Sequence, residues 1–252
     1  MTTLEFLSHL RDLDIQIWVD GDRLRYNAPK GRLTPETRAE LVGRKAEILS
    51  LLRKASAQPP RIRPVAREGP LPLSFGQERL WFLDQLESDN PAYNIGRAVR
   101  LLGPLDLQVL QQCLDEIVRR HEILRTNFVM VEGQPVQVIA PGRSVPLPVL
   151  DLRGSHDGQH LVMVEKLVNE ESRRPFDLER DLLFRAKLLW LQEQDHVLIL
   201  TMHHIASNGW SIRVLFREIS ILYGSFSHGA ESPLPEPPIQ YADFAMWQRE
   251  WL

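Results

Sequence analysis

The stretch "DHVLILTMHHIASNGWS", Asp195 to Ser211, decides how the larger part of this chain is expected to fold. An apolar run ends at the adjacent pair His203 and His204, and "SIRVLFREISILYGSF" then follows with apolar residues at helical spacing. A buried strand that leads through a turn into a helix is typical of a mixed α/β sheet. The sequence therefore predicts a strand tip that carries a histidine.

Neighbouring side chains on a strand point to opposite faces, so His203 and His204 cannot both reach one ligand. No third ligand accompanies them, and we predict no metal site. One imidazole at a strand tip, beside backbone N–H groups at a helix start, suits general-base work or an oxyanion-forming acyl transfer. Gly209 would let backbone turn sharply or approach a ligand. A structural histidine pair without chemistry is the alternative.

The sequence offers no sign of a covalent acyl-enzyme. A Gly-x-Ser-x-Gly elbow is absent, and Cys113, the one cysteine, lies on an expected helix far from the loop.

Other periodic segments surround this strand and alternate between helical and extended patterns. An amphipathic helix is expected to run up to Arg125. It would place Leu110, Leu114, Ile117 and Val118 inward. We predict helices over 73–86, 105–125, 161–176 and 211–226, a hairpin over 128–140 turning at Glu132 and Gly133, and two strands over 184–204. The predicted fold class is mixed α/β.

Residues 1–54 predict a small separate domain of order αββαα. Thr3 is expected to cap a helix bearing Leu4, Leu7 and Leu10, and Thr34 to cap a second helical stretch that Gly43 divides. Between them, 15–26 alternates apolar and polar residues around an Asp-Gly turn, which indicates a hairpin.

The hairpin is a candidate peptide-binding element, since a two-stranded sheet has free edges that accept an incoming strand. Arg23, Arg25, Tyr26 and Lys30 are the candidate docking residues, and the cations favour an acidic peptide. These charges could instead only keep a small domain soluble.

Residues 55–70 are rich in proline and predict a linker, which leaves 71–252 as the second domain. The net charge of -3 gives no reason to expect nucleic acid. No signal peptide and no membrane-length apolar run is visible, so a cytoplasmic protein without a membrane partner is expected.

Four segments together resemble nonribosomal peptide synthetase condensation domains. "MHHIASNGWS" resembles their HHxxxDG motif, while "SFGQERLW" (Ser74 to Trp81), "RHEILRTNF" (Arg120 to Phe128) and "YADFAMWQ" (Tyr241 to Gln248) resemble flanking motifs in the family's order. The HHxxxDG motif also occurs in acyltransferases related to chloramphenicol acetyltransferase, and four ordered motifs are more specific.

The resemblance implies an acetyltransferase-like lobe that helps to form an amide between a thioester donor and an aminoacyl acceptor. Both substrates would arrive on phosphopantetheine arms of separate carrier domains, with no cofactor bound to this chain. His204 would face the channel and His203 would be structural, with Gly209 completing the motif. Trp210, Asn208 and Arg125 would support the site.

Residues 1–54 resemble the N-terminal docking domains of the tubulysin-synthetase type, through "WVDGDRLRYNAPKG" and "LTPETRAELVGRKAEIL". This likeness implies capture of the C-terminal peptide of an upstream synthetase subunit. Whether the docking domain also forms a homodimer stays open.

The sequence departs from the condensation pattern in two places. Asn208 replaces the motif's aspartate, whose ion-pair partner would be Arg125 here, and an asparagine oxygen still accepts from a guanidinium. The chain also stops soon after the fourth motif, so the family's second lobe is expected to be absent, as in a fragment or split subunit. A non-catalytic docking scaffold and a free-standing coenzyme A-dependent acetyltransferase are the alternative functions.

Overall fold

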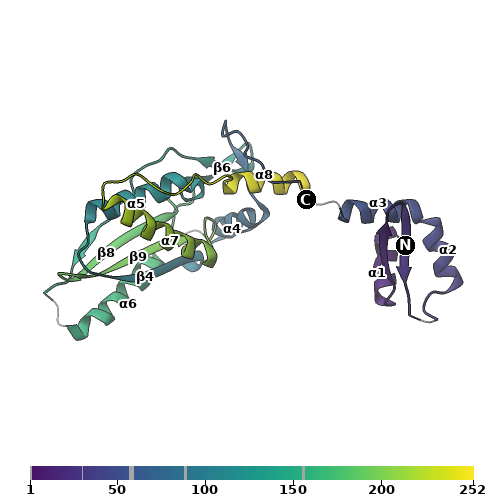
Figure 1. Ribbon diagram of the computed structural model, residues 1–252, viewed down its shortest axis with the longest axis horizontal. Helices are drawn as coiled ribbons and strands as arrows, with labels where there is room; N and C mark the ends of the chain where they lie inside the picture. The colour runs from purple at the N-terminus through teal and green to yellow at the C-terminus, as the bar shows by residue number, and fades with distance from the viewer. Residues whose placement is uncertain (1, 30, 57–59, 88–89, 155–156) are drawn as a thin grey trace. The chain divides into compact units, whose positions relative to one another are not determined.

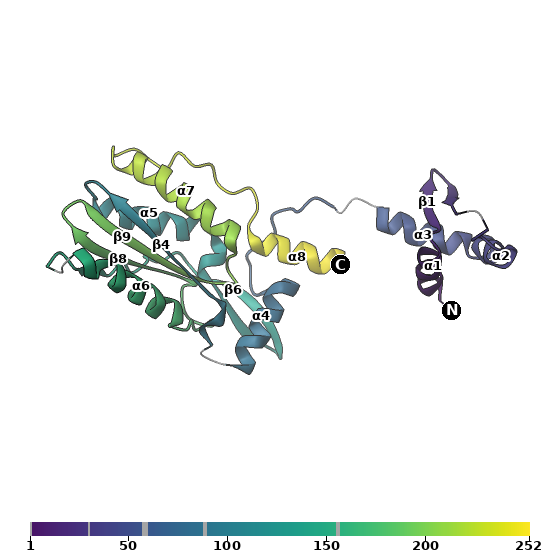
Figure 2. The same cartoon turned by 90° about the horizontal axis from the view of Figure 1, so that it is seen from below.

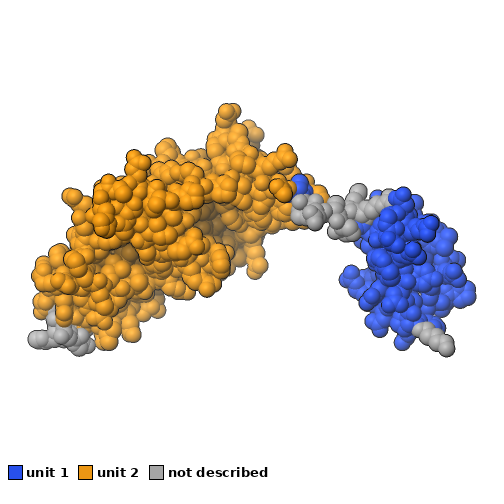
Figure 3. Space-filling model, viewed as in Figure 1, with its two compact units in different colours: residues 1–60 blue, residues 61–252 orange. Residues whose placement is uncertain are grey.

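The computed structural model describes residues 2–29, 31–56, 60–87, 90–154 and 157–252. The chain divides into two compact units, residues 1–60 and residues 61–252, which Figure 3 colours separately. Each unit has its own buried apolar cluster.

The boundary between the units falls earlier than the expected domain start at residue 71. The Val65 amide donates to the Asp243 carboxylate over 2.9 Å, and Arg67 forms ion pairs with Asp243 and Glu122. These bonds make residues 61–70 part of the larger unit rather than a linker.

The smaller unit has the predicted αββαα order. Its elements are α1 (Thr3–Asp12), β1 (Gln16–Asp20), β2 (Arg23–Asn27), α2 (Pro35–Gly43) and α3 (Lys45–Ser56). The two strands pair antiparallel, with Asp20 opposite Arg23, so the turn is Gly21-Asp22 rather than Asp20-Gly21. Thr34 caps α2 as predicted, and the helical stretch divides after Gly43.

The predicted cap of α1 was wrong by one residue. Thr2 is the N-cap, and its hydroxyl accepts from the Glu5 amide while the Glu5 carboxylate accepts from the Thr2 amide. This capping box satisfies two donors and turns Phe6 and Leu10 inward, which leaves Leu4 exposed.

The larger unit combines two sheets and five α-helices among its described residues. Its elements are β3 (Leu71–Pro72), α4 (Phe75–Leu86), η1 (Pro91–Tyr93), β4 (Asn94–Leu102), α5 (Leu107–Arg120), η2 (Glu122–Arg125), β5 (Thr126–Val131), β6 (Gln134–Ile139), β7 (Val149–Asp151), α6 (Asp157–Arg173), β8 (Phe184–Gln192), β9 (Asp195–His203), α7 (Gly209–Phe226) and α8 (Tyr241–Trp251).

The main sheet is mixed, as predicted. Its strand order is β4-β9-β8-β7, in which β7 and β8 are parallel and the other pairs antiparallel. A second sheet has the order β3-β6-β5. The helix expected to reach Arg125 ends at Arg120, because His121 adopts extended backbone and the short helix η2 follows.

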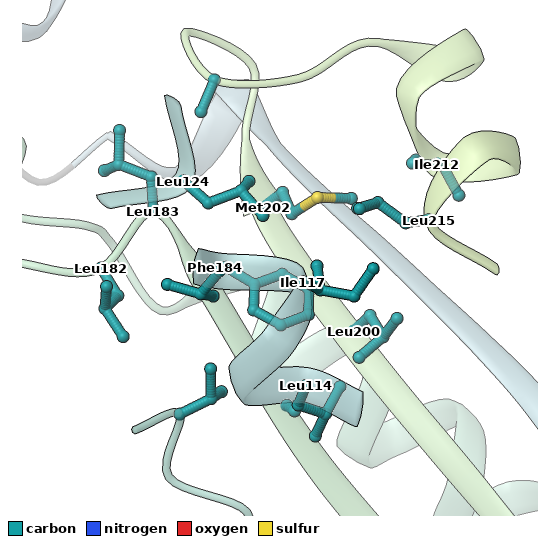
Figure 4. Close-up of a cluster of buried hydrophobic side chains, with 14 of the residues drawn as sticks. Leu114, Ile117, Leu124, Leu182, Leu183, Phe184, Leu200, Met202, Ile212 and Leu215 are labelled. Carbon is teal, nitrogen blue, oxygen red and sulfur yellow. The ribbon is translucent and has the colours of Figure 1, made fainter. Parts of the chain in front are cut away.

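Helices cover both faces of the main sheet. Figures 1 and 2 both show α5 and α7 on one face and α6 on the other. On the α5 and α7 face, Leu200 and Met202 of β9 join Leu114 and Ile117 of α5 in the large apolar cluster (Figure 4). Strand β9 is buried along its whole length and delivers the histidine pair to the end of the sheet.

Candidate functional site

The histidine pair lies where β9 ends. His203 is its last residue, opposite Asn94 of β4, and only 3% of it is exposed. His204 lies one residue beyond the strand and is exposed, while its amide donates to the Tyr93 carbonyl over 2.8 Å. The structure therefore separates the two imidazoles into one buried and one exposed group.

His203 has a closed environment. The rings of Tyr93 and Phe176 meet it edge-on, with centroids 6.3 and 6.2 Å away. Its Nδ1 accepts from the Ile205 amide over 3.2 Å, so the neutral ring carries its proton on Nε2. Burial, and secondarily the neighbouring His204, lower the pKa of His203 to about 4. His203 is thus a neutral ring that holds the turn carrying His204.

The start of α7, where an oxyanion site was one of the two expected kinds of chemistry, is capped by a side chain. Asn208 Oδ1 accepts from the amides of Trp210 and Ser211 over 3.0 and 2.9 Å. Two of the amides at the helix start are therefore bound to this side chain rather than open to an oxyanion. This arrangement favours proton transfer or substrate orientation over oxyanion stabilisation at the helix start.

Asn208 does not bind Arg125, the partner that the resemblance implied for the motif's aspartate. Arg125 donates to the Ala140 carbonyl instead, and its buried Nε has no hydrogen-bond partner. Arg125 makes no ion pair within the described ranges, and it is only half-buried, so solvent shares its charge. Asparagine satisfies the helix start without needing that arginine.

Gly209 and Trp210 begin α7, and of the two roles expected for Gly209 the sharp turn is the one that the backbone does not need. Gly209 has no left-handed backbone, and a Cβ placed there would meet no protein atom within 4 Å. A sharp turn does not require this glycine. Trp210 is 68% exposed, with the Arg213 guanidinium 5.1 Å from its ring centroid. Its indole offers a surface beside the histidine turn.

A pocket of about 170 Å³ lies beside the turn that follows His204, and sequence analysis did not anticipate it. Its lining includes Ser207, Trp210 and His121. His121 Nε2 lies 2.8 Å from the buried Glu218 carboxylate, and Arg120 Nε lies 3.6 Å from the same oxygen. These groups tie the end of α5 to α7.

The aromatic rings around His203 were also missed. Tyr93 and Phe176 lie far from the histidines in sequence, and no local pattern links them to β9. Only the pairing of β4 with β9, and the packing of the segment after α6, bring them together.

The hairpin of the smaller unit does not gather all the predicted docking residues on one face. Trp18 pairs with Arg25, and Arg23 follows on the same outward face. Tyr26 pairs with Ile17, which packs against the unit's core, so Tyr26 is on the opposite face. Lys30 lies outside the described residues.

The outward face holds an aromatic side chain that the prediction left out. Trp18 is 47% exposed, and the Arg25 guanidinium pairs with Asp20 at 3.1 Å. An aromatic residue at a polar-facing position of an alternating strand was the available signal.

Metal clusters and membrane-spanning helices, neither of which was expected from the sequence, can be assessed among the described residues. These residues contain no cluster of three or more His, Cys, Asp or Glu side chains arranged to hold a metal ion. None of their helices is both long and apolar enough to cross a membrane.

Comparison with known proteins connects these features to a family. Residues 67–252 match the condensation domain family, which covers most of the chain and both histidines. The chain belongs to the condensation domain family. Residues 4–54 match the TubC N-terminal docking domain. The predicted order of docking unit and condensation unit is therefore confirmed.

Individual relatives agree with this assignment. The chain is 48% identical over 192 residues to one subunit of the linear gramicidin synthase of Brevibacillus parabrevis, a match that covers 76% of this chain and 2% of that protein. The X-domain from teicoplanin biosynthesis is a structural neighbour at TM-score 0.68 and 30% identity, covering 76% of this chain and 40% of that one.

A condensation domain of the enacyloxin polyketide synthase shares the fold at TM-score 0.67 and 24% identity, over 100% of this chain and 48% of that one. The predicted acetyltransferase-like α/β condensation fold is thus confirmed. The condensation-domain chain nevertheless spans only a small fraction of the synthetases that it matches.

Proposed function

We propose that this condensation unit forms an amide between a carrier-bound thioester donor and an aminoacyl acceptor, with His204 as the group that handles the amine proton. The observation that carries the proposal is the exposed imidazole of His204 at the end of a buried strand, beside a neighbour that is fully buried. Both substrates would be held on phosphopantetheine arms of carrier domains.

In this role His204 does more than deprotonate the acceptor amine before the reaction. An α-amine has a pKa of about 8, so neutralising it at pH 7 costs only about 1.4 kcal/mol. The larger contributions are orientation of the amine and removal of the proton that becomes acidic as the C–N bond forms. An exposed imidazole on a turn fixed by His203 suits both tasks.

The test compares His204→Ala with the unchanged chain in a complete synthetase supplied with two loaded carrier domains. We expect dipeptidyl thioester to form about 100-fold more slowly, which is within the range that general acid–base catalysis contributes. His228→Ala, an exposed histidine beyond the end of α7, is the matched control. Unchanged formation in His204→Ala would leave only the docking role.

We further propose that the smaller unit captures an acidic C-terminal peptide of an upstream synthetase subunit. Arg23 and Arg25 extend from the outward face of the hairpin, beside the exposed ring of Trp18. A peptide strand added at the hairpin edge would gain backbone hydrogen bonds and place its carboxylates near these cations.

Binding of an acidic peptide to the chain by calorimetry tests this role. Arg23→Glu and Arg25→Glu should each weaken binding several-fold, and more so at low salt, because exposed charges are screened by ions. Arg38→Glu on α2 makes the same charge change away from the hairpin and should leave binding intact. Equal losses in all three variants would indicate a non-specific charge effect.

A further inference from the structure

The C-terminus of α6 is held by two side chains from β4 and β8, the two strands that flank β9. A helix ends with carbonyls that have no partner within the helix. Asn94 Nδ2 donates to the carbonyls of Ser172 and Arg174, over 2.9 and 2.8 Å. Arg185 donates to the carbonyls of Glu171, Arg174 and Pro175. We call Asn94 and Arg185 the α6 clamp.

Arg185 is suited to this place for two reasons. Its positive charge lies at the negative end of the helix, and its planar fork reaches several carbonyls at once. The guanidinium carbon also lies 3.8 Å from the centroid of the Phe176 ring, within the range of a cation–π contact. The clamp therefore fixes Phe176 as well as the helix end.

The clamp is linked to the histidine pair through this ring. Phe176 is buried and meets His203 edge-on, while Asn94 lies directly opposite His203 in the strand pairing. Arg185 pairs with Thr201, two residues before His203 and on the same face of the sheet. Both members of the clamp thus flank one imidazole.

His203 passes this restraint to the turn. Its Nδ1 accepts from the Ile205 amide, and that amide lies immediately after His204. A tilt of the buried ring would break this bond and let the turn shift. Misplacement of a reacting group by about 1 Å costs on the order of 100-fold in rate.

We propose that Arg185 is a positioning residue for His204, acting through Phe176 and His203. This role rests on the proposed function. Arg185 lies outside the HHIASNG segment, on β8, which is next to the histidine strand β9. Arg185 touches no substrate in this role; it sets the direction of an imidazole that does.

A double-variant cycle in the complete synthetase tests the inference. Arg185→Met should lower kcat for dipeptidyl thioester about ten-fold and leave KM unchanged, because binding does not depend on the direction of His204. Adding Arg185→Met to His204→Ala should cost no further rate. Arg185→Lys keeps the charge but not the fork, and should fall between Met and wild type.

Controls separate positioning from loss of folding. Arg143 and Arg185 both line a cleft of about 490 Å³, and Arg143 donates to the Arg180 carbonyl. Arg143→Met removes this second guanidinium and should leave kcat unchanged. Nitrogen NMR of the His203 ring should show a changed Nδ1 signal in Arg185→Met and none in Arg143→Met. Melting curves of each variant report whether it is folded.

The outcomes are distinct. If His204→Ala is slow and Arg185→Met is as fast as wild type, the positioning role is wrong and the proposed function stands. A further ten-fold loss in the double variant would show that Arg185 acts independently of His204, which also overturns the inference. If His204→Ala is itself fast, the proposed function and the inference both fail.

Discussion

At the scale of single residues, the buried ring of His203 should govern the acid stability of the condensation unit. Its pKa is lowered from 6.5 in the unfolded chain to about 4 in the fold, because burial disfavours the charged form. Between these values the unfolded state binds the extra proton. Stability is therefore full above pH 6.5 and falls as the pH drops towards 4, by up to about 3 kcal/mol.

Urea unfolding at several pH values between 4 and 7 measures this slope. His203→Gln should be less stable at pH 7 but should lose less on acidification. His204→Gln removes only the secondary cause of the lowered pKa of His203, so most of the slope of the unchanged chain should remain. An identical slope in all three chains would assign the acid sensitivity to other groups.

The Asn208 side chain also acts at this scale, as a helix cap. Asn208→Ala should lower the free energy of unfolding by about 1 kcal/mol, because two α7 amides lose their acceptor. Asn208→Asp should keep the cap and gain about 0.3–1 kcal/mol from the helix dipole. Urea unfolding at low salt compares the three chains. An aspartate variant that is less stable in urea than the alanine variant would contradict this account.

At the scale of helices and strands, the sequence predicted the elements whose residues carry a strong local pattern. The inward face of α5 and the turn between β5 and β6 follow directly from periodicity and from Glu132-Gly133, both of which have left-handed backbone. Strand β4 was missed because its side chains are mostly half-exposed and only pairing with β9 defines it. Likewise, no spacing rule could show that Asn208 binds its own helix rather than Arg125.

The contact between β4 and α6 requires a glycine. A Cβ at Gly96 would lie 2.1 Å from Ser172 Oγ and 3.3 Å from its Cβ. Gly96→Ala should therefore cost about 1 kcal/mol, since the Ser172 hydroxyl must rotate away and its Cβ must give by a small amount. Gly224→Ala on the exposed side of α7 meets nothing within 4 Å and should gain up to about 1 kcal/mol. Opposite signs in thermal melts would support both assignments; destabilisation by both would contradict the steric reason.

Glu218 joins two helices through a buried charge. Glu218→Ala would leave Arg120 buried without its carboxylate and should cost about 3–5 kcal/mol in urea unfolding. Glu170→Ala removes a carboxylate from an exposed pair with Lys166 and should change stability by less than about 1 kcal/mol. Similarly small changes in stability for the two variants would mean that solvent reaches the Glu218 carboxylate.

At the scale of the whole molecule, the sequence predicted two domains and their families but misplaced the boundary between them. Proline-rich residues 61–70 have no periodic pattern, so they resembled a linker. Asp243, far along the chain, holds Val65 and Arg67 through its carboxylate. A long-range carboxylate of this kind leaves no trace in local composition, and it moves the boundary to about residue 60.

This boundary predicts two independent unfolding transitions. Each unit has its own core, Phe6 and Leu10 in one and Leu114 and Phe128 in the other. A 60-residue unit buries a smaller fraction of its surface than a larger one and should melt first. In calorimetry, residues 61–252 alone should therefore keep the higher transition of the full chain. A chain that starts at residue 71 should melt at a lower temperature, because it loses the Arg67 ion pairs with Asp243 and Glu122. If both truncated chains melt alike, residues 61–70 are a linker after all.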